Sequence, residues 1–202
     1  MKNYIFILIL CAFYQQCSGQ TEIINIKDQG KYWTASVGQY YKDIDNELDY
    51  YNGTWLYNNG NKSIKLVLIK KVKLYNGKIY DDVIVGGVEY KESNNIIVNT
   101  LPYLSNSYSD YTDYAISGNS LVPNYGAPKC FDCQPNELRL RLSYHELNPD
   151  TIFGTMILRK IMVNGQDAIK LNLKADMVYY EAGTTPPLDF KLPVGEYIFI
   201  KQ

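Results

Sequence analysis

The stretch "SIKLVLIKKVKLYNGKIYDDVIVGGVEY", residues 63–90, decides the expected fold. Its first half alternates between apolar and polar side chains, which indicates a β-strand with one buried face. The apolar residues expected on that face are Ile64, Leu66, Leu68, Val72 and Leu74. Asn76 and Gly77 follow, a pair that tolerates the positive φ angles of a type I′ hairpin turn. A second strand over about residues 78–92 should therefore pair with the first.

The same alternation recurs in the rest of the chain, and no segment keeps a helical period. A first strand is expected to start at Gly53, before the quoted stretch. Further strands are expected at residues 96–101, 114–122, 137–145, 151–163, 168–180 and 196–201. In residues 168–180, alternate positions from Ile169 to Tyr179 form one apolar face, and Asn164–Gly165 makes the hairpin turn before it. Strands joined in chain order by short turns predict an all-β antiparallel meander.

Each of these strands has one apolar face to bury, so the sheet must close into a barrel or fold into a sandwich. Nearest-neighbour hairpins favour a meander that closes into a lipocalin-like (calycin-like) β-barrel. Gly86–Gly87 favours it too, because missing side chains permit a bulge or a sharp coil of the sheet. A β-sandwich is the alternative.

The N-terminus predicts export. Lys2, an apolar run over residues 4–14 and a patch of small residues are typical of a secretory signal peptide at residues 1–19. Residues 20–202 then form a single β-barrel domain without a membrane span. Lipidation of Cys17 is the alternative to simple cleavage after Gly19. We therefore expect a secreted, periplasmic or cell-envelope protein.

Charge and composition limit the partners. The chain has 20 Lys and Arg against 21 Asp and Glu, a net charge of −1, and no basic block. This balance argues against nucleic acid as a partner. Tyrosine is frequent, with 20 residues, which suits both sheet surfaces and polar-rimmed binding faces.

Two resemblances follow from specific residues. An acidic segment from Asp43 runs into Gly53-Thr54-Trp55, which resembles the lipocalin opening of a short helix followed by Gly-x-Trp. That resemblance implies that Gly53 allows close backbone approach and that Trp55 plugs the barrel base. Lipocalins stack an arginine of the last strand on this tryptophan, whereas the final strand here has only Lys191 and Lys201 around it, a departure from the lipocalin pattern. A tryptophan in an ordinary β core is the alternative.

A longer resemblance covers nearly all of residues 20–202. It rests on the segments "YYKDIDNEL", "YYNGTWLY", "YDDVIVGGVEY", "NNIIVNTLP" and "LPVGEYIFIKQ" in this order. Together they resemble a family of short exported proteins of Gram-negative bacteria, domain of unknown function number six-seven-zero-five. The resemblance implies a single domain in the envelope or outside the cell, and it transfers no catalytic residue.

Residue types that carry chemistry are few. Cys130 and Cys133 lie in a proline-bracketed loop without a following helix, so a disulfide is favoured over a redox pair or a zinc site. His145 is the only histidine, and no Gly-x-Ser-x-Gly motif accompanies it. The acidic residues from Asp43 onward alternate as in calcium loops, but Leu48 and Thr54 replace the required glycine and glutamate. We expect no catalytic residue, metal or cofactor.

The functional expectation rests on tyrosine-rich loops. We expect a non-catalytic protein that binds a small apolar or glycan-like ligand at the barrel mouth away from Trp55. The residues expected at that mouth are Tyr103, Tyr108, Tyr111, Tyr114 and Tyr125. A solidly packed interior would count against this hypothesis. The alternatives are a structural or protein-partner-binding module of the envelope and, if two carboxylates converge in a pocket, a glycosidase.

Overall fold

The computed structural model describes residues 21–28, 34–148, 151–177 and 188–202. The expected signal peptide, Cys17 and Tyr179 lie outside the described residues. Among the residues that the structure does describe, no helix is long and apolar enough to cross a bilayer. The helical segments with assigned bounds are the short 3-10 turns η2 (Asp49–Tyr51), η3 (Leu101–Ser105) and η4 (Tyr111–Asp113).

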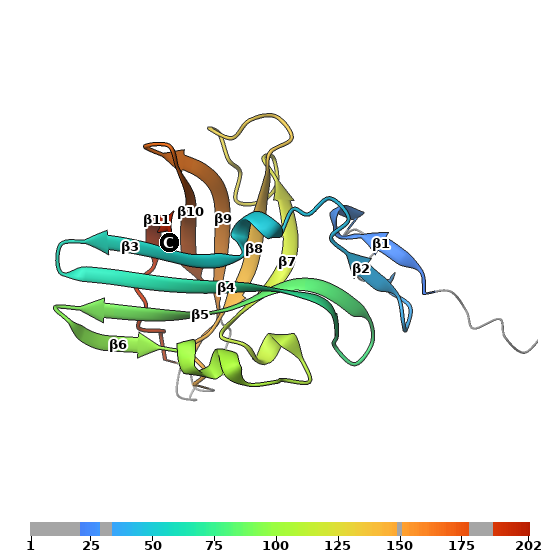
Figure 1. Cartoon of the computed structure of the whole chain (residues 1–202), viewed down its shortest axis with the longest axis horizontal. Helices are drawn as coiled ribbons and strands as arrows, with labels where there is room; N and C mark the ends of the chain where they lie inside the picture. Colours follow the sequence, from blue (N-terminus) through green and yellow to red (C-terminus); the bar gives the residue numbers. More distant parts are fainter. Residues whose placement is uncertain (1–20, 29–33, 149–150, 178–187) are drawn as a thin grey trace, which may run out of the picture.

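Eight antiparallel strands close into a β-barrel, which confirms the predicted meander and rejects the sandwich (Figure 1). Each strand pairs with the next in the barrel, β11 pairs with β3, and β5 pairs with β7 across the closure. The barrel strands are β3 (Gly53–Asn59), β4 (Lys62–Tyr75), β5 (Tyr80–Glu92), β7 (Ile116–Pro123), β8 (Leu138–Tyr144), β9 (Gly154–Val163), β10 (Gln166–Ala175) and β11 (Gly195–Lys201).

Three strands lie outside the barrel. β6 (Asn95–Asn99) forms a hairpin with the end of β5, whereas β1 (Ile23–Asn25) and β2 (Tyr40–Lys42) form a parallel pair that joins the start of β5. One edge of β5 is therefore shared in turn by β2, β7 and β6. The sequence did not predict β1 and β2, because three residues are too few for an alternation to be recognised.

The alternation of β4 holds only in its first part. Ile64, Leu66 and Leu68 are buried as expected. The expectation for Val72 is wrong, because this side chain is exposed. The register of β4 against β5 shifts between Lys71 and Leu74, and a β-bulge there reverses the side-chain parity.

The turns and the far end of β10 also refine the expectations. Only Gly77 of the Asn76–Gly77 pair has a positive φ, so the first hairpin is not of type I′. Asn164 and Gly165 have φ angles of 50° and 78°, as a type I′ turn requires. The apolar face of β10 ends early, since Met177 is exposed beyond the end of the strand.

Gly86 and Gly87 serve close packing and not a bulge. The register of β4 against β5 is continuous through both residues. A Cβ on Gly86 would lie 2.7 Å from the Leu68 side chain, and one on Gly87 would lie 3.2 Å from the carbonyl oxygen of Thr100. The missing side chains thus let β5 coil tightly against its neighbours.

The barrel interior is packed. Side chains at its centre have almost no accessible surface, as in a close-packed core. The central side chains, each at most 1% exposed, are Trp55, Leu66, Leu68, Leu140, Leu142, Tyr144, Met156, Leu158, Ile169, Leu171, Leu173 and Phe199. This close packing counts against a ligand deep inside the barrel, and the expected binding at the barrel mouth stays a prediction.

One end of the barrel is closed around Trp55, which is fully buried. Its Nε1 donates a hydrogen bond to the carbonyl oxygen of Tyr51 at 2.9 Å, which fixes the ring under η2. The Lys201 Nζ lies 5.1 Å from the centre of the Trp55 ring, and a Cβ on Gly53 would lie 3.4 Å from Lys201. The lysine of the last strand thus takes the place that the resemblance assigned to arginine.

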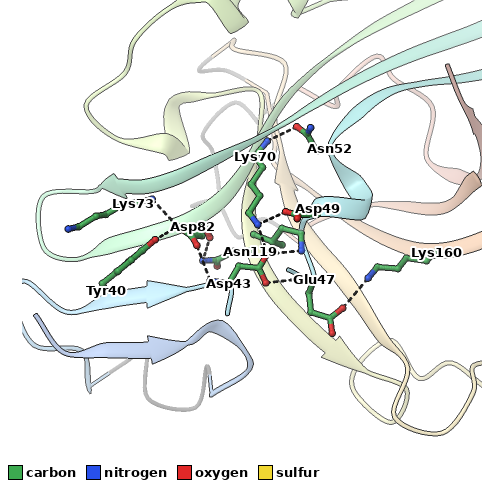
Figure 2. Close-up of polar contacts among 11 residues, drawn as sticks. Tyr40, Asp43, Glu47, Asp49, Asn52, Lys70, Lys73, Asp82, Asn119 and Lys160 are labelled. Atoms are coloured by element: carbon green, nitrogen blue, oxygen red, sulfur yellow. Dashed lines mark hydrogen bonds and ion pairs between the residues drawn. The ribbon is translucent and has the colours of Figure 1, made fainter. Parts of the chain in front are cut away.

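A polar network fixes the chain segment ahead of η2 (Figure 2). The Asp43 carboxylate accepts hydrogen bonds from the backbone N–H groups of Glu47 and Leu48, and it pairs with the Lys70 Nζ at 2.8 Å. Lys70 also pairs with Asp49 of η2. Since Lys70 follows Leu68 on the inner face of β4, its charge meets these carboxylates at the end of the barrel.

Asp82 of β5 extends this network to the outer strands (Figure 2). Its buried carboxylate accepts hydrogen bonds from the Tyr40 hydroxyl at 2.6 Å and from the backbone N–H groups of Asp43 and Lys73, both at 2.9 Å. Three donors satisfy a buried charge that would otherwise be costly. Asp82 thereby ties β2 and the β4 bulge to the barrel.

The opposite end of the barrel, where β9 begins, is closed by residues 188–194, which we call the plug segment. Phe190 and Leu192 of this segment are buried and belong to the main core. The Glu146 Oε1 accepts hydrogen bonds from the backbone N–H groups of Lys191 and Leu192 and from the Tyr144 hydroxyl. In the described part of the chain, η2 and the plug segment thus cover the two ends of the barrel.

Candidate functional site

A pocket of about 670 Å³, here called the rim pocket, opens at the end of the barrel away from Trp55. It lies where η3, the segment that follows β8 and the segment that precedes β9 meet. Its size is in the range of small-molecule sites. The rim pocket is lined by Tyr103, Asn106, Tyr108, Asp113, His145, Leu147, Asn148, Thr151 and Phe153.

The structure brings four of the five expected tyrosines together, in two different roles. Tyr103 and Tyr108 line the rim pocket. Tyr111 and Tyr114 differ from the expectation, because both are buried and pack on the outward side chains of β5 in a small second core. The Tyr114 ring meets Tyr108 edge to face at 4.7 Å, so the buried tyrosines support the pocket wall without reaching the ligand.

Tyr125 lies in another place. It belongs to the loop between β7 and β8, which leaves the barrel at the end where β9 and β10 turn (Figure 1). Its side chain is 77% exposed and does not line the rim pocket. Tyr125 therefore does not share an end of the barrel with the other four expected tyrosines, since β7 carries the chain to the opposite end.

His145 and Phe153 are pocket residues that the sequence did not indicate as such. The His145 Nδ1 accepts a hydrogen bond from the N–H of Leu147 at 3.3 Å, and its Nε2 lies 3.3 Å from the carbonyl oxygen of Thr112. An imidazole with its proton on Nε2 satisfies both contacts. The imidazole also contacts the Phe153 ring in a tilted arrangement, with the ring centres 5.2 Å apart.

The rim pocket combines open aromatic rings with polar groups. Tyr103 and Phe153 are 49% and 54% exposed, respectively, although both are large and apolar. Asp113 and Asn106 add an exposed carboxylate and an exposed amide, and Thr151 adds a hydroxyl. Saccharides bind where aromatic ring faces cover the C–H groups of the sugar and where nearby polar groups form hydrogen bonds with its hydroxyls. The rim pocket has both features.

The cysteine pair forms a disulfide in the structure, between Cys130 and Cys133. Their sulfur atoms lie near the Asp132 carboxylate in a cluster of potential metal ligands. Because the sulfurs are bonded to each other, they offer no thiolate to a metal in this state. The loop lies over the outer face of β8 to β10 and is held by Arg159, which pairs with Asp132 at 2.7 Å.

Two of the buried carboxylates, Asp43 and Asp82, are engaged in hydrogen bonds away from the rim pocket. Asp43 and Asp82 each accept three hydrogen bonds within the protein. Neither lines the rim pocket, whose lining includes a single carboxylate, that of Asp113. The arrangement of two carboxylates across a pocket, expected of a glycosidase, is thus not present at this site.

These features define a class: an all-β protein with a closed eight-stranded barrel, a packed interior and a ligand-sized pocket on its outer rim. Residues 1–202 match the model of the Family of unknown function (DUF6705), and the chain belongs to this family. This confirms the resemblance read from its segments. No curated protein and no solved structure matches the chain.

Proposed function

We propose that this protein is an exported, non-catalytic β-barrel that binds a glycan-like ligand in the rim pocket. One observation carries the proposal: two exposed rings, Tyr103 and Phe153, face a ligand-sized pocket beside Asp113 and Asn106. A glycan is favoured over a purely apolar ligand, because polar groups line the same pocket as the rings. The packed interior also favours a ligand that binds at the surface.

The non-catalytic part of the proposal is supported by the chemistry of the pocket. Its imidazole, that of His145, already uses both nitrogens within the protein, and its carboxylate has no second carboxylate opposite. General acid–base catalysis requires a group within hydrogen-bond reach of the reacting atom and free to exchange its proton. Export is supported by the apolar segment at residues 4–14.

Ligand binding is tested by titrating the purified protein with mono- and oligosaccharides and following saturation-transfer NMR. We expect Tyr103→Ala and Phe153→Ala each to weaken binding by about tenfold, from the loss of one stacking surface. Tyr125→Ala is the matched control, since it removes an exposed tyrosine outside the pocket. Unchanged binding by both pocket variants, or no transfer from any saccharide, would refute the proposal.

Export is tested separately by the mass of the protein isolated from its own host. A chain that starts at Gln20 supports simple cleavage, and an acylated chain that starts at Cys17 supports a lipid anchor. An intact N-terminus in a cytoplasmic fraction would refute export without affecting the binding proposal.

The packed interior favours one rival, a structural or protein-partner-binding module of the envelope. A pull-down from envelope extract distinguishes this rival by recovering a protein partner. The rival predicts that substitutions in the exposed strand β6 abolish the capture and that Phe153→Ala retains it.

A further inference from the structure

A second hollow lies on the outer wall of the barrel, beneath the disulfide loop. We call it the basic groove; its volume is about 470 Å³, and it shares no lining residue with the rim pocket. The loop from Pro128 to Asp132 forms one side, and outward-facing residues of β8 to β11 form the other. The basic groove is lined by Pro128, Lys129, Cys130, Phe131, Asp132, Arg139, Ile157, Arg159, Lys170, Asn172, Lys174 and Glu196.

Cations outnumber carboxylates along this groove. Two of its cations are paired: Arg159 with Asp132 and Glu137, and Lys170 with Glu196 at 3.1 Å. The other lining cations are Lys129, Arg139 and Lys174, and no carboxylate of the described chain pairs with any of them. A surplus of positive charge thus remains within one ligand-sized hollow.

Arg139 is the unusual member of this set, because its side chain is only 4% exposed. Its Nη2 donates to the carbonyl oxygens of Pro123 and Gly126 at 3.0 and 3.1 Å. Its Nε is buried without a hydrogen-bond partner among the described residues. Its hydrogen bonds go only to neutral carbonyl oxygens. Glu137 and Asp132 favour the charged guanidinium electrostatically, but neither forms an ion pair with it among the described residues, so its loss of hydration is only partly offset.

The physical state of Arg139 indicates what is missing. Burial lowers the pKa of this guanidinium, yet an arginine stays charged at neutral pH. The planar, charge-assisted donors of arginine match carboxylate and phosphate oxygens best. Phe131 and Ile157 add apolar surface beside the charge, and Phe131 is almost fully exposed with Lys129 above its ring.

From this geometry we infer a second binding site, in which Arg139, Lys174 and Lys129 bind the oxyanion of a small carboxylate- or phosphate-bearing molecule. Arg139 supplies the buried charge, and the two lysines supply flexible charges at the groove edge. The ring of Phe131 covers the uncharged part of the ligand. The site is independent of the rim pocket, so its failure leaves the proposed function untouched.

The test is an NMR and calorimetric titration at low ionic strength with inorganic phosphate, glucose 6-phosphate, glucuronate and neutral glucose as probes. We expect at least one charged probe to bind and to shift the amides of residues 129–132 and 170–174. Arg139→Met should weaken binding by about tenfold or more, and Lys174→Met by about threefold. Lys65→Met, which removes a single exposed charge from β4, should leave it unchanged.

The probes also separate the two sources of the oxyanion. Binding of glucuronate alone assigns a carboxylate ligand, and binding of the phosphate probes alone assigns a phosphate ligand. Should Arg139→Met not fold, Lys174→Met together with the positions of the shifted amides decides the matter. Absence of binding by all charged probes at millimolar concentration, equal binding by the variants and the wild type, or shifts confined to the rim pocket would overturn the inference.

Discussion

At the scale of the residue, Trp55 shows how one side chain can close a barrel end. Its indole is buried, hydrogen-bonded to η2 and covered by the ammonium group of Lys201, which also lies 5.5 Å from the Tyr50 ring. Because the ammonium group lies near both rings, it links β11 to η2, the turn that precedes β3. This contact explains how the barrel end is sealed without the arginine that the resemblance implied.

Replacing Lys201 tests this contact. Lys201→Met keeps most of the aliphatic packing and removes the cation, so the free energy of unfolding should fall by about 1 kcal/mol. Lys201→Arg should retain most of the stability, and Lys65→Met serves as the exposed control. Urea unfolding followed by circular dichroism measures the difference; equal stability of Lys201→Met and the wild type would show that the ring contact contributes nothing.

The residue scale also shows why tyrosine composition alone could not locate a site. Tyr103 and Tyr111 lie in the same polar stretch, yet one lines the rim pocket and the other is core. The difference arises because η4 turns Tyr111 onto β5, a contact between distant segments that local sequence does not encode. Phe153 was missed for a similar reason. It precedes β9 and its pocket neighbour His145 follows β8, and only the folded barrel brings the two side chains together.

At the scale of the element, the plug segment depends on one carboxylate. Glu146 accepts hydrogen bonds from the N–H groups of Lys191 and Leu192. Glu146→Ala should lower the free energy of unfolding by about 2 kcal/mol, a typical cost for lost hydrogen bonds to a charged acceptor. Hydrogen exchange at these two amides should accelerate, whereas Glu92→Ala, which removes a surface ion pair, should cost well under 1 kcal/mol. Unchanged exchange in Glu146→Ala would contradict the assigned clamp.

The outer strands depend in the same way on Asp82. Asp82→Asn places amide hydrogens against donors that need an acceptor, so we expect a loss of about 3 kcal/mol of stability. Tyr40→Phe removes only one of these donors and should cost about 1 kcal/mol. Thermal unfolding of both variants gives the comparison. The account of this network fails if Asp82→Asn is no less stable than Tyr40→Phe.

Strand positions were predictable from sequence where the alternation is unbroken, as in the first part of β4 and in β8. Alternation reports which side of a strand is buried, and that information is local. The bulge in β4 and the early end of β10 were not predictable, because they depend on pairing with a neighbouring strand. The plug segment was missed because it has no periodic pattern, and only its contact with Glu146 places it.

At the scale of the whole molecule, ion pairs on the barrel wall predict the response to acid. Burial alone would raise the pKa of Glu47 and of Glu137. The effect of Lys27 and Lys160 on Glu47, and of Arg159 on Glu137, is larger than that of burial, so both pKa values lie below the ordinary 4.5. The unfolded chain binds protons more readily there. The stability from these pairs is therefore present above pH 4.5 and is lost as the pH falls below it.

At high pH, the buried tyrosines make the stability fall as the pH rises, the reverse of the trend in acid. Burial raises the pKa of Tyr51 and of Tyr144 well above the ordinary value of 10. Stability is therefore retained below pH 10 and falls above it, since the unfolded chain ionises first. Urea midpoints measured across pH 3 to 12 should show both declines; a flat profile at either end would contradict the corresponding assignment.

The central claim is that the barrel interior is solid and that ligand recognition occurs on its outer rim. Methyl- and amide-resolved NMR during a saccharide titration tests it most directly. The account predicts shifts at Tyr103, Asn106 and Phe153, with the methyl groups of Leu66, Leu142 and Leu171 unchanged. Shifts concentrated on those interior leucines would show a ligand inside the barrel and contradict the claim.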